Sequence, residues 1–344
     1  MSTSAKNKAM LNRNESFGFW TLGLLLLPLI ACSDTGGPPV SQADTGVVQQ
    51  FDGAVSELSI ADSSLVDSGK PPALDAAPVE VKKNGTYKDI VYAQVGGVAL
   101  KGDLYLAQKR EGLLILVHGG AFVSGTKTTM SGIAQYLLPK GYASFSVDYR
   151  VNKQGGAFPA MPQDILCAIA FARDHAQEYG YPPEKIAILG TSAGGALVSI
   201  VGAMSNMESY RPSCAGQTDL SVVGVIPGFG LHDWLERENQ GEIATSEAAY
   251  LGGSFADHPE NYTEASPVTH VNSITAPYLL FHGSVDEAIP YHQSELMHEA
   301  LQKAGKSSEL LIVDGAGHSF VFKPSDYKDQ ALAAIEAFLA KVFL

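Results

Sequence analysis

The segment Ile186–Gly195 reads IAILGTSAGG and decides the fold of this chain. Its first four residues are apolar at every position, which is typical of a strand buried on both faces of a sheet. Ser192 then stands between Gly190 and Gly194, directly before a segment with helical periodicity, Ala193–Ser205. Gly-x-Ser-x-Gly between a strand and a helix favours a tight turn that lifts a nucleophilic serine above the sheet. Because 35 of the 344 residues are glycine, the pattern alone also fits an ordinary glycine-rich turn.

Short apolar runs and segments with helical periodicity alternate along the rest of the chain. The runs are Leu113–Val117, Ala143–Val147, Val222–Ile226, Tyr278–Phe281 and Leu310–Val313, and the helical segments include Met161–Tyr179, Gln293–Ala304 and Asp326–Phe343. Ile90–Val95 and Val98–Leu106 flank Gly96-Gly97 and predict an antiparallel hairpin. The alternation predicts an α/β fold, with a mostly parallel central sheet and helices on both of its faces.

A glycine-rich loop follows the run Leu113–Val117 and reads His118-Gly119-Gly120-Ala121. Small residues allow backbone N–H groups to approach a ligand closely. We expect the amides of Gly120 and Ala121, together with that of Ala193, to form an oxyanion hole. His118 is interpreted as a residue that orients the loop by hydrogen bonding.

Two further loops supply a carboxylate and an imidazole. Asp286 follows the run Tyr278–Phe281, and His318 follows the last apolar run. The order Ser, Asp, His along the chain is that of a nucleophile, an orienting acid and a general base on this type of sheet. Glu287 is the nearest alternative to Asp286, and Asp314 is a poorer one.

Five blocks carry a family resemblance: HGGAF (118–122), DYR (148–150), GTSAGG (190–195), HGSVDEAIP (282–290) and GAGHSF (315–320). Together they resemble the α/β-hydrolase fold, and within it the group of bacterial feruloyl and acetyl esterases (BD-FAE-like) and kynurenine formamidases. Residues 251–271 resemble the short cap of that group, so a cap insertion is expected over roughly 229–275. The resemblance implies a Ser192–His318–Asp286 triad on a sheet of about eight strands. Many relatives carry a third glycine at the position of Ala121; alanine keeps the amide but alters the width of the pocket.

The predicted function is that of a serine carboxylic-ester hydrolase that acts on small or medium acyl or aryl esters through an acyl-enzyme. No metal or organic cofactor is required, and the partner is a small-molecule ester. An amidase, formamidase or peptidase with the same triad is the alternative reading, and a non-catalytic binding module is a second one. The pocket is expected to be built by four aromatic residues, namely Phe122, Trp234, Tyr250 and Phe320.

Composition excludes one class of partner. The chain carries 23 Lys and Arg against 36 Asp and Glu, a formal charge of −13. A protein that binds nucleic acid needs a basic surface to neutralise phosphates, so no nucleic acid partner is expected. The sequence makes no prediction of the oligomeric state.

The N-terminal region is predicted to be a targeting segment. An apolar stretch, Phe17–Ala31, follows three basic residues and ends at Cys32; its length is that of a signal peptide. Leu29-Ile30-Ala31-Cys32 resembles a bacterial lipobox, which implies a signal over 1–32, lipidation of Cys32, and an exported lipoprotein of the bacterial cell envelope that meets the membrane only through its lipid. The alternative is an ordinary cleaved signal or a short anchor. Residues 33–84 hold eight acidic residues and one aromatic residue and are predicted to be a disordered linker; the catalytic domain is expected over 85–344.

The two remaining cysteines, Cys167 and Cys214, lie in a predicted helix and a polar loop. An exported domain folds in an oxidising compartment, so a disulfide between them is one interpretation. A buried small side chain and a free thiol are the other.

Overall fold

The predicted strands assemble into a single sheet in the computed structural model, which describes residues 80–344. The strand order is β1-β2-β4-β3-β5-β6-β7-β8. β2 is antiparallel to β1 and β4, and the remaining pairs are parallel. The strands are β1 (Gly85–Val95), β2 (Val98–Leu106), β3 (Leu113–Val117), β4 (Ala143–Val147), β5 (Ile186–Thr191), β6 (Gly224–Gly228), β7 (Tyr278–Gly283) and β8 (Ser308–Val313). The expected mostly parallel sheet of about eight strands, including its N-terminal hairpin, is confirmed.

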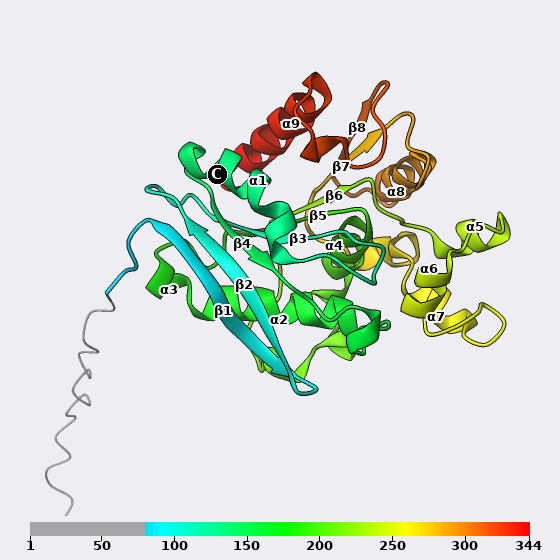
Figure 1. Ribbon diagram of the computed structural model, residues 1–344, viewed down its shortest axis with the longest axis horizontal. Coiled ribbons are helices and arrows are strands. Elements are labelled where there is room, and N and C mark those ends of the chain that lie inside the picture. Colours follow the sequence, from blue (N-terminus) through cyan, green and yellow to red (C-terminus); the bar gives the residue numbers. More distant parts are fainter. Residues whose placement is uncertain (1–79) are drawn as a thin grey trace, which may run out of the picture. The chain divides into compact units, whose positions relative to one another are not determined.

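Helices connect the parallel strands (Figure 1). The α-helices are α1 (Ser131–Leu137), α2 (Ala160–Asp174), α3 (Ala176–Tyr179), α4 (Ala193–Met204), α5 (Trp234–Asn239), α6 (Thr245–Tyr250), α7 (Pro259–Glu264), α8 (His292–Lys303) and α9 (Asp326–Val342). Short 3₁₀ helices are η1 (Lys127–Met130), η2 (Leu138–Lys140), η3 (Asn152–Gln154), η4 (Glu208–Tyr210), η5 (Ser213–Ala215), η6 (Pro267–Ser273) and η7 (Phe320–Phe322). No helix within residues 80–344 is long and apolar enough to cross a membrane.

Some strands are longer than their apolar runs, β1 by five residues at its start and β8 by two, and two other elements differ in division or position. The helix expected over Met161–Tyr179 is divided at His175, whose backbone (φ −103°, ψ 9°) leaves the helical region. The strand expected over Val222–Ile226 lies two residues later, because Pro227 and Gly228 pair with the end of β5. Neither shift changes the order of the elements.

Successive side chains of a strand point to opposite faces of the sheet, and in this sheet both faces pack against a hydrophobic core. Leu113, Ile115 and Val117 of β3 point into a core that also contains α2, α4 and α8. Leu114 and Leu116 point into a second core, with α1 and α9. Helices therefore cover both faces, as the continuously apolar strands predicted.

The parallel register brings four loops to one edge of the sheet. Val117, the last residue of β3, lies opposite Gly190 of β5. Thr191 in turn lies opposite Gly228, and Gly283 of β7 lies opposite Val313 of β8. Because these strands end together, the segments that follow β3, β5, β7 and β8 meet at their carboxyl ends.

The cap segment, residues 229–275, follows β6 and contains α5, α6, α7 and η6. In Figure 1 its three α-helices lie together at one side of the sheet, next to α8. Trp234 and Tyr250 of this segment are fully buried, so the cap segment packs as part of the core.

The described residues begin within the predicted linker. Lys82 donates its N–H to the carbonyl of Glu178 (2.8 Å), and its own carbonyl accepts from Arg110 (2.7 Å). These bonds attach residues 80–84 to the domain just before β1. The rest of the linker, the predicted signal and Cys32 lie outside the described residues.

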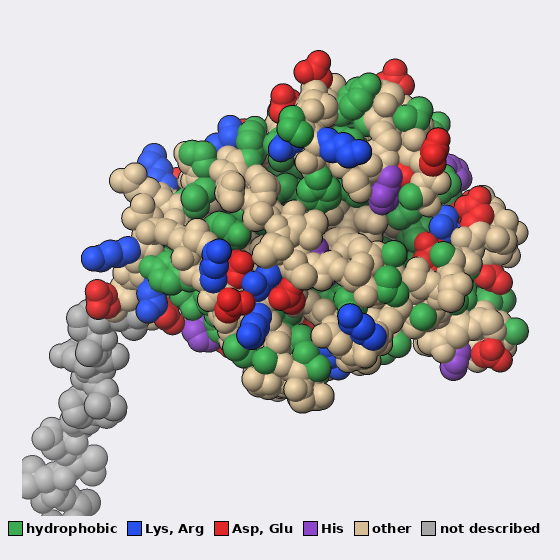
Figure 2. Space-filling view, in the orientation of Figure 1, with side chains coloured by type: hydrophobic (Ala, Val, Ile, Leu, Met, Phe, Trp, Pro, Cys, Tyr) green, Lys and Arg blue, Asp and Glu red, His purple; other side chains and the backbone are tan. Residues whose placement is uncertain are grey.

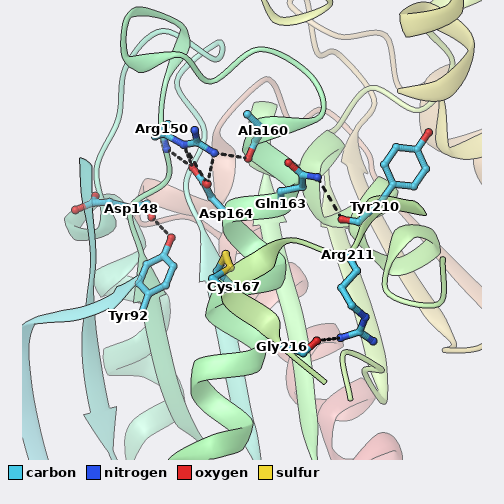
Figure 3. The surroundings of a disulfide bond; sticks show 11 residues. Tyr92, Asp148, Arg150, Ala160, Gln163, Asp164, Cys167, Tyr210, Arg211 and Gly216 are labelled. Carbon is cyan, nitrogen blue, oxygen red and sulfur yellow. Dashed lines mark hydrogen bonds and ion pairs between the residues drawn. A yellow bond between two sulfur atoms is a disulfide. The ribbon is translucent and has the colours of Figure 1, made fainter. Parts of the chain in front are cut away.

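A disulfide joins Cys167 of α2 to Cys214 of η5, with 5.6 Å between their Cα atoms. Figure 3 shows Cys167 in the same helix as Asp164, which forms a fork with Arg150. The bridge therefore ties the η5 loop to a helix of the core. Of the two interpretations left open by the sequence, the structure contains the bonded one.

Figure 2 shows acidic and basic side chains interspersed on the viewed face.

Replacing both cysteines should destabilise the fold. The bridge spans 47 residues of sequence. A cross-link of that span lowers the conformational entropy of the unfolded chain and thereby stabilises the fold by about 4 kcal/mol. We expect Cys167→Ala/Cys214→Ala to lower the free energy of unfolding by about that amount in urea denaturation under oxidising conditions. The control is wild-type protein unfolded in urea in the presence of a reductant, and its free energy of unfolding should approach that of the variant. A loss below about 1 kcal/mol would contradict the stabilising role of the bridge.

Candidate active site

Ser192 lies in a strained turn between β5 and α4. Its backbone angles are φ 56° and ψ −123°, a region that a residue with a side chain adopts only under constraint. Its N–H donates to the carbonyl of Gly228 (2.9 Å). A Cβ atom at Gly190 would lie 2.1 Å from the carbonyl oxygen of Gly194, and one at Gly194 would lie 2.3 Å from that of Val117. The turn therefore requires both glycines, which confirms it as more than a generic glycine-rich turn.

His318 lies in the loop after β8 and contacts both predicted partners. Its Nε2 is 3.0 Å from Ser192 Oγ, and its Nδ1 is 2.7 Å from Asp286 Oδ2. A carboxylate can only accept, so Nδ1 carries the hydrogen and Nε2 is left to accept from the serine hydroxyl. The edge of the ring packs against Phe229, with 4.9 Å between the ring centroids. The ring is thus held in the tautomer that a general base needs.

The Asp286 side chain is completely buried, and its two oxygens accept several hydrogen bonds. Oδ1 accepts from the amides of Ala288 (2.9 Å) and Ile289 (3.0 Å). Oδ2 accepts from His318 and lies 3.3 Å from His282 Nε2. Burial alone would raise the pKa of Asp286, but the hydrogen bonds from His282, His318 and Ile289 outweigh it and hold that pKa well below its ordinary value. The carboxylate is therefore ionised at neutral pH.

The two alternative acids do not reach His318. Asp314 accepts a hydrogen bond from the hydroxyl of Ser284 (3.0 Å) instead, and Glu287 is exposed. Asp286 is the acid that the structure brings to the imidazole.

His282 is a buried residue that sequence reasoning did not assign. It is the penultimate residue of β7, the only polar side chain of that strand's otherwise apolar run, and has no exposed surface. Its Nδ1 contacts the Ser294 hydroxyl (2.8 Å), and its Nε2 contacts the carbonyl of Ile289 (2.9 Å) as well as Asp286. His282 thereby holds the segment that carries the acid. The available signal was a polar residue at the end of a strand that is apolar elsewhere.

The loop after β3 presents unused amides beside Ser192. Within residues 80–344, no protein acceptor bonds the N–H groups of Gly120, Ala121 or Ala193, whereas the carbonyl of Gly120 accepts from Val123 and Ser124. Ala121 lines one cavity with Ser192 and Ala193, and a second one with Ser192 and Gly120. Ala121 adopts φ 50°, which a glycine would adopt at lower cost. The three residues whose amides are predicted to form an oxyanion hole thus line the cavities at Ser192.

His118 orients this loop, as predicted. Its Nδ1 lies 2.7 Å from the carbonyl of Gly119, and its ring stacks on Tyr149 at 4.4 Å between centroids. The hydroxyl of Tyr149 donates to the carbonyl of His118 (2.9 Å). Burial lowers the pKa of His118, so the ring is neutral at pH 7.

A cavity of about 250 Å³ adjoins Ser192 and His318. Of the four aromatic residues expected to line it, only Phe122 does so. Tyr250 stacks behind Phe122 with 4.3 Å between their rings, and Trp234 packs against both. Phe320 packs instead against Phe229 and Phe281. Trp234 and Tyr250 therefore support the wall from within the core and do not line it, and the prediction was wrong for Phe320, which packs elsewhere.

The cap segment contributes charged residues to this cavity that the sequence did not indicate. Arg237 and Glu247 line it together with Ala244 and Ser246. No cluster of three or more His, Cys, Asp or Glu side chains in the described part of the chain is arranged to hold a metal ion. The site therefore consists of a serine, an imidazole and a carboxylate, free amides, and a pocket that the cap segment lines in part.

Comparison with known proteins places these features in a family. The model of the BD-FAE family matches residues 103–301. Esterase LipC of Mycobacterium tuberculosis is 32% identical over 67% of this chain and 58% of its own length. The chain spans a little over half the length of the curated relatives it matches.

Solved structures show the same arrangement of elements. A bifunctional GH43-CE protein of Bacteroides eggerthii has a TM-score of 0.66 and 27% identity, and the match covers 74% of this chain and 38% of that one. The propionate-bound esterase 2 of Thermogutta terrifontis has a TM-score of 0.63 and 25% identity, over 75% of this chain and 95% of that one.

The close approach at Gly194 can be tested by adding a single methyl group. We expect Gly194→Ala to lower the free energy of unfolding by more than about 2 kcal/mol, because its Cβ would collide with backbone that cannot move freely. Gly132→Ala in α1 is the matched control: a Cβ there meets nothing within 4 Å, so stability should rise by about 0.5–1 kcal/mol. Equal effects of the two changes in thermal and urea denaturation would refute the packing argument.

Proposed function

This chain belongs to the BD-FAE family and has the α/β-hydrolase fold, and from its site we propose that it is a serine ester hydrolase that acts through an acyl-enzyme. The observation that carries the proposal is the continuous set of hydrogen bonds from Ser192 through His318 to Asp286. Free amides next to the serine complete the parts that acyl transfer needs.

Acylation follows from this geometry. As Ser192 Oγ attacks the ester carbonyl carbon, its proton passes to His318 Nε2, and the ionised Asp286 stabilises the resulting imidazolium. The carbonyl oxygen becomes an oxyanion and is held by the amides of Ala121 and Ala193, with Gly120 as a third donor. The intermediate then collapses: the bond to the alcohol oxygen breaks, and His318 returns its proton to that oxygen. The acyl group is left bonded to Ser192.

Deacylation uses the same groups. His318 removes a proton from water, whose oxygen attacks the acyl carbon, and the same amides hold the second oxyanion. Collapse of this intermediate breaks the bond to Ser192 Oγ, which regains its proton from His318. The products are a carboxylic acid and an alcohol, and no step uses a group outside the chain except water.

Small or medium acyl and aryl esters are the proposed substrates. The cavity beside Ser192 has a volume of about 250 Å³, slightly below the roughly 300–1,000 Å³ of typical small-molecule pockets. Related proteins support an ester rather than an amide, since they are an esterase in Mycobacterium tuberculosis and a propionate-bound esterase in Thermogutta terrifontis. Amide hydrolysis by the same triad is the competing activity.

We further propose that the chain is an exported lipoprotein of the bacterial cell envelope, attached to a membrane through a lipid on Cys32. The support is the sequence alone: a basic start, the apolar stretch Phe17–Ala31 and the lipobox-like residues before the cysteine. The acidic linker that follows would separate the anchor from the hydrolase domain.

Two substitutions test the triad. With p-nitrophenyl butyrate as substrate, Ser192→Ala and Asp286→Asn should each lower kcat/KM by about 10⁴-fold or more, because the first removes the nucleophile and the second disturbs the tautomer of His318. Asp314→Asn is the matched control and should stay within about threefold of wild type, since its carboxylate contacts Ser284 and not the imidazole.

Labelling and leaving groups complete this test. A fluorophosphonate should label the wild-type chain and leave Ser192→Ala unlabelled. Matched p-nitrophenyl esters and anilides should be hydrolysed with a clear preference for the ester. Full activity of Ser192→Ala would refute the mechanism. If the anilides were hydrolysed faster than the matched esters, the protein would be assigned as an amidase and not as an esterase.

The anchor can be tested in a bacterial host that expresses the full chain. Wild type should enter the detergent phase in a phase-partition assay, and Cys32→Ser should remain in the aqueous phase, because a lipid is the only proposed attachment. The neighbouring change Ser33→Ala should behave as wild type. Wild-type protein in the aqueous phase, or Cys32→Ser in the detergent phase, would reject lipidation.

A further inference from the structure

The cavity under the cap segment contains a pair of opposite charges. Arg237 of α5 and Glu247 of α6 line it together with Ser192 and His318. The side chain of Arg237 is 9% exposed and that of Glu247 10% exposed, so both charges are largely removed from water. The remaining wall is mostly apolar and includes Phe122, Ala196, Leu231 and Ile289.

The two charges form two hydrogen bonds with each other, and each has a further partner. Arg237 Nε donates to Glu247 Oε2 (2.9 Å), and Nη2 donates to Oε1 (3.1 Å), which forms a two-point fork. Nη1 of the same guanidinium donates to Glu242 (3.1 Å). Glu247 also accepts from the amide of Ala244 (2.9 Å), at the start of α6. The pair thus holds α5 and α6 together and presents a rigid polar surface to the cavity.

A second cavity, of about 460 Å³, also reaches Ser192 and His318. Its lining comes mainly from the segments after β3 and β8, including Ser124, Thr129 and Ser319, and Phe229 is the one residue of the cap segment in it. During turnover the alcohol must leave and water must enter while the acyl group stays bonded to the serine. The larger cavity suits the departing alcohol, and the smaller, mostly apolar cavity lined by α5 and α6 suits the acyl group.

We infer that Arg237 and Glu247 determine acyl-chain specificity: the paired charges limit the acyl cavity to short chains. A long alkyl chain would cover the pair and remove its remaining water without offering a hydrogen bond in return, which is unfavourable for buried charges. A short acyl group fits into the cavity of about 250 Å³ and leaves the pair undisturbed. This inference rests on the proposed esterase function.

The test replaces both charges at once. Removing Arg237 alone would leave Glu247 buried without a cation, and removing Glu247 alone would leave Nε and Nη2 of Arg237 without their carboxylate, whereas replacing a buried pair by apolar residues is often neutral. We expect Arg237→Met/Glu247→Met to raise the ratio of kcat/KM for p-nitrophenyl octanoate to that for p-nitrophenyl butyrate by about tenfold or more over wild type. An unchanged ratio in the folded variant would overturn the inference.

A second variant covers the case in which the first does not fold. Arg237→Met/Glu247→Gln keeps an amide oxygen that can accept from Ala244, so the start of α6 retains its hydrogen bond. The same increase in the octanoate-to-butyrate ratio is expected, and no increase would again overturn the inference. The matched control is Lys341→Met/Glu309→Met, which removes an exposed ion pair between α9 and β8 and should leave the ratio unchanged.

Wild-type rates separate this inference from the proposed function. If the wild-type protein hydrolyses butyrate esters at least tenfold faster than octanoate esters, both stand. If it hydrolyses both esters equally well, the length limit is wrong while the esterase function holds. If it hydrolyses no ester, the proposed function itself fails.

Discussion

The close approach of the β5–α4 turn to neighbouring backbone is the constraint on which the rest of the site depends. Gly194 lies against the carbonyl of Val117 at the end of β3, so the turn can form only where those two strands end side by side. The same contact leaves Ser192 in a strained conformation at the start of α4. The packed sheet compensates for this strain, and the serine hydroxyl projects from the sheet edge where the other loops converge.

The ionisation state of the Asp286 carboxylate at this edge of the sheet is determined by the hydrogen bonds that it accepts in a buried environment. An isolated buried carboxylate would be protonated, but Asp286 accepts from two backbone amides and from His318, with His282 beside it. The carboxylate therefore remains ionised and fixes the imidazole. The amides of Ala288 and Ile289 hold the acid in position, and the two histidines contribute more than the Ile289 amide to keeping it ionised.

The cap segment converts this edge into a pocket. Its buried aromatics support Phe122 from behind, and its Arg237–Glu247 pair supplies a polar wall. The residues proposed to limit the acyl chain therefore lie in a segment that carries none of the reacting groups. Such a division allows the reactive geometry to stay constant while the accepted acyl group changes.

The fold class, most of the strands and the candidate residues Ser192, Asp286 and His318 could be predicted from the sequence, because apolar runs are local patterns and the motifs that carry the three residues follow a recognisable order. Boundaries shifted by two residues at β6, where pairing with β5 decides the strand. The pairing of the cysteines and of the acid with its imidazole became clear from the packed structure alone. The same is true of Trp234 and Tyr250, which support the pocket wall instead of lining it. It is also true of His282, Arg237 and Glu247, which belong to the site. Each of these findings depends on side chains from segments far apart in the sequence packing together, and a local sequence pattern does not specify which distant segments come into contact.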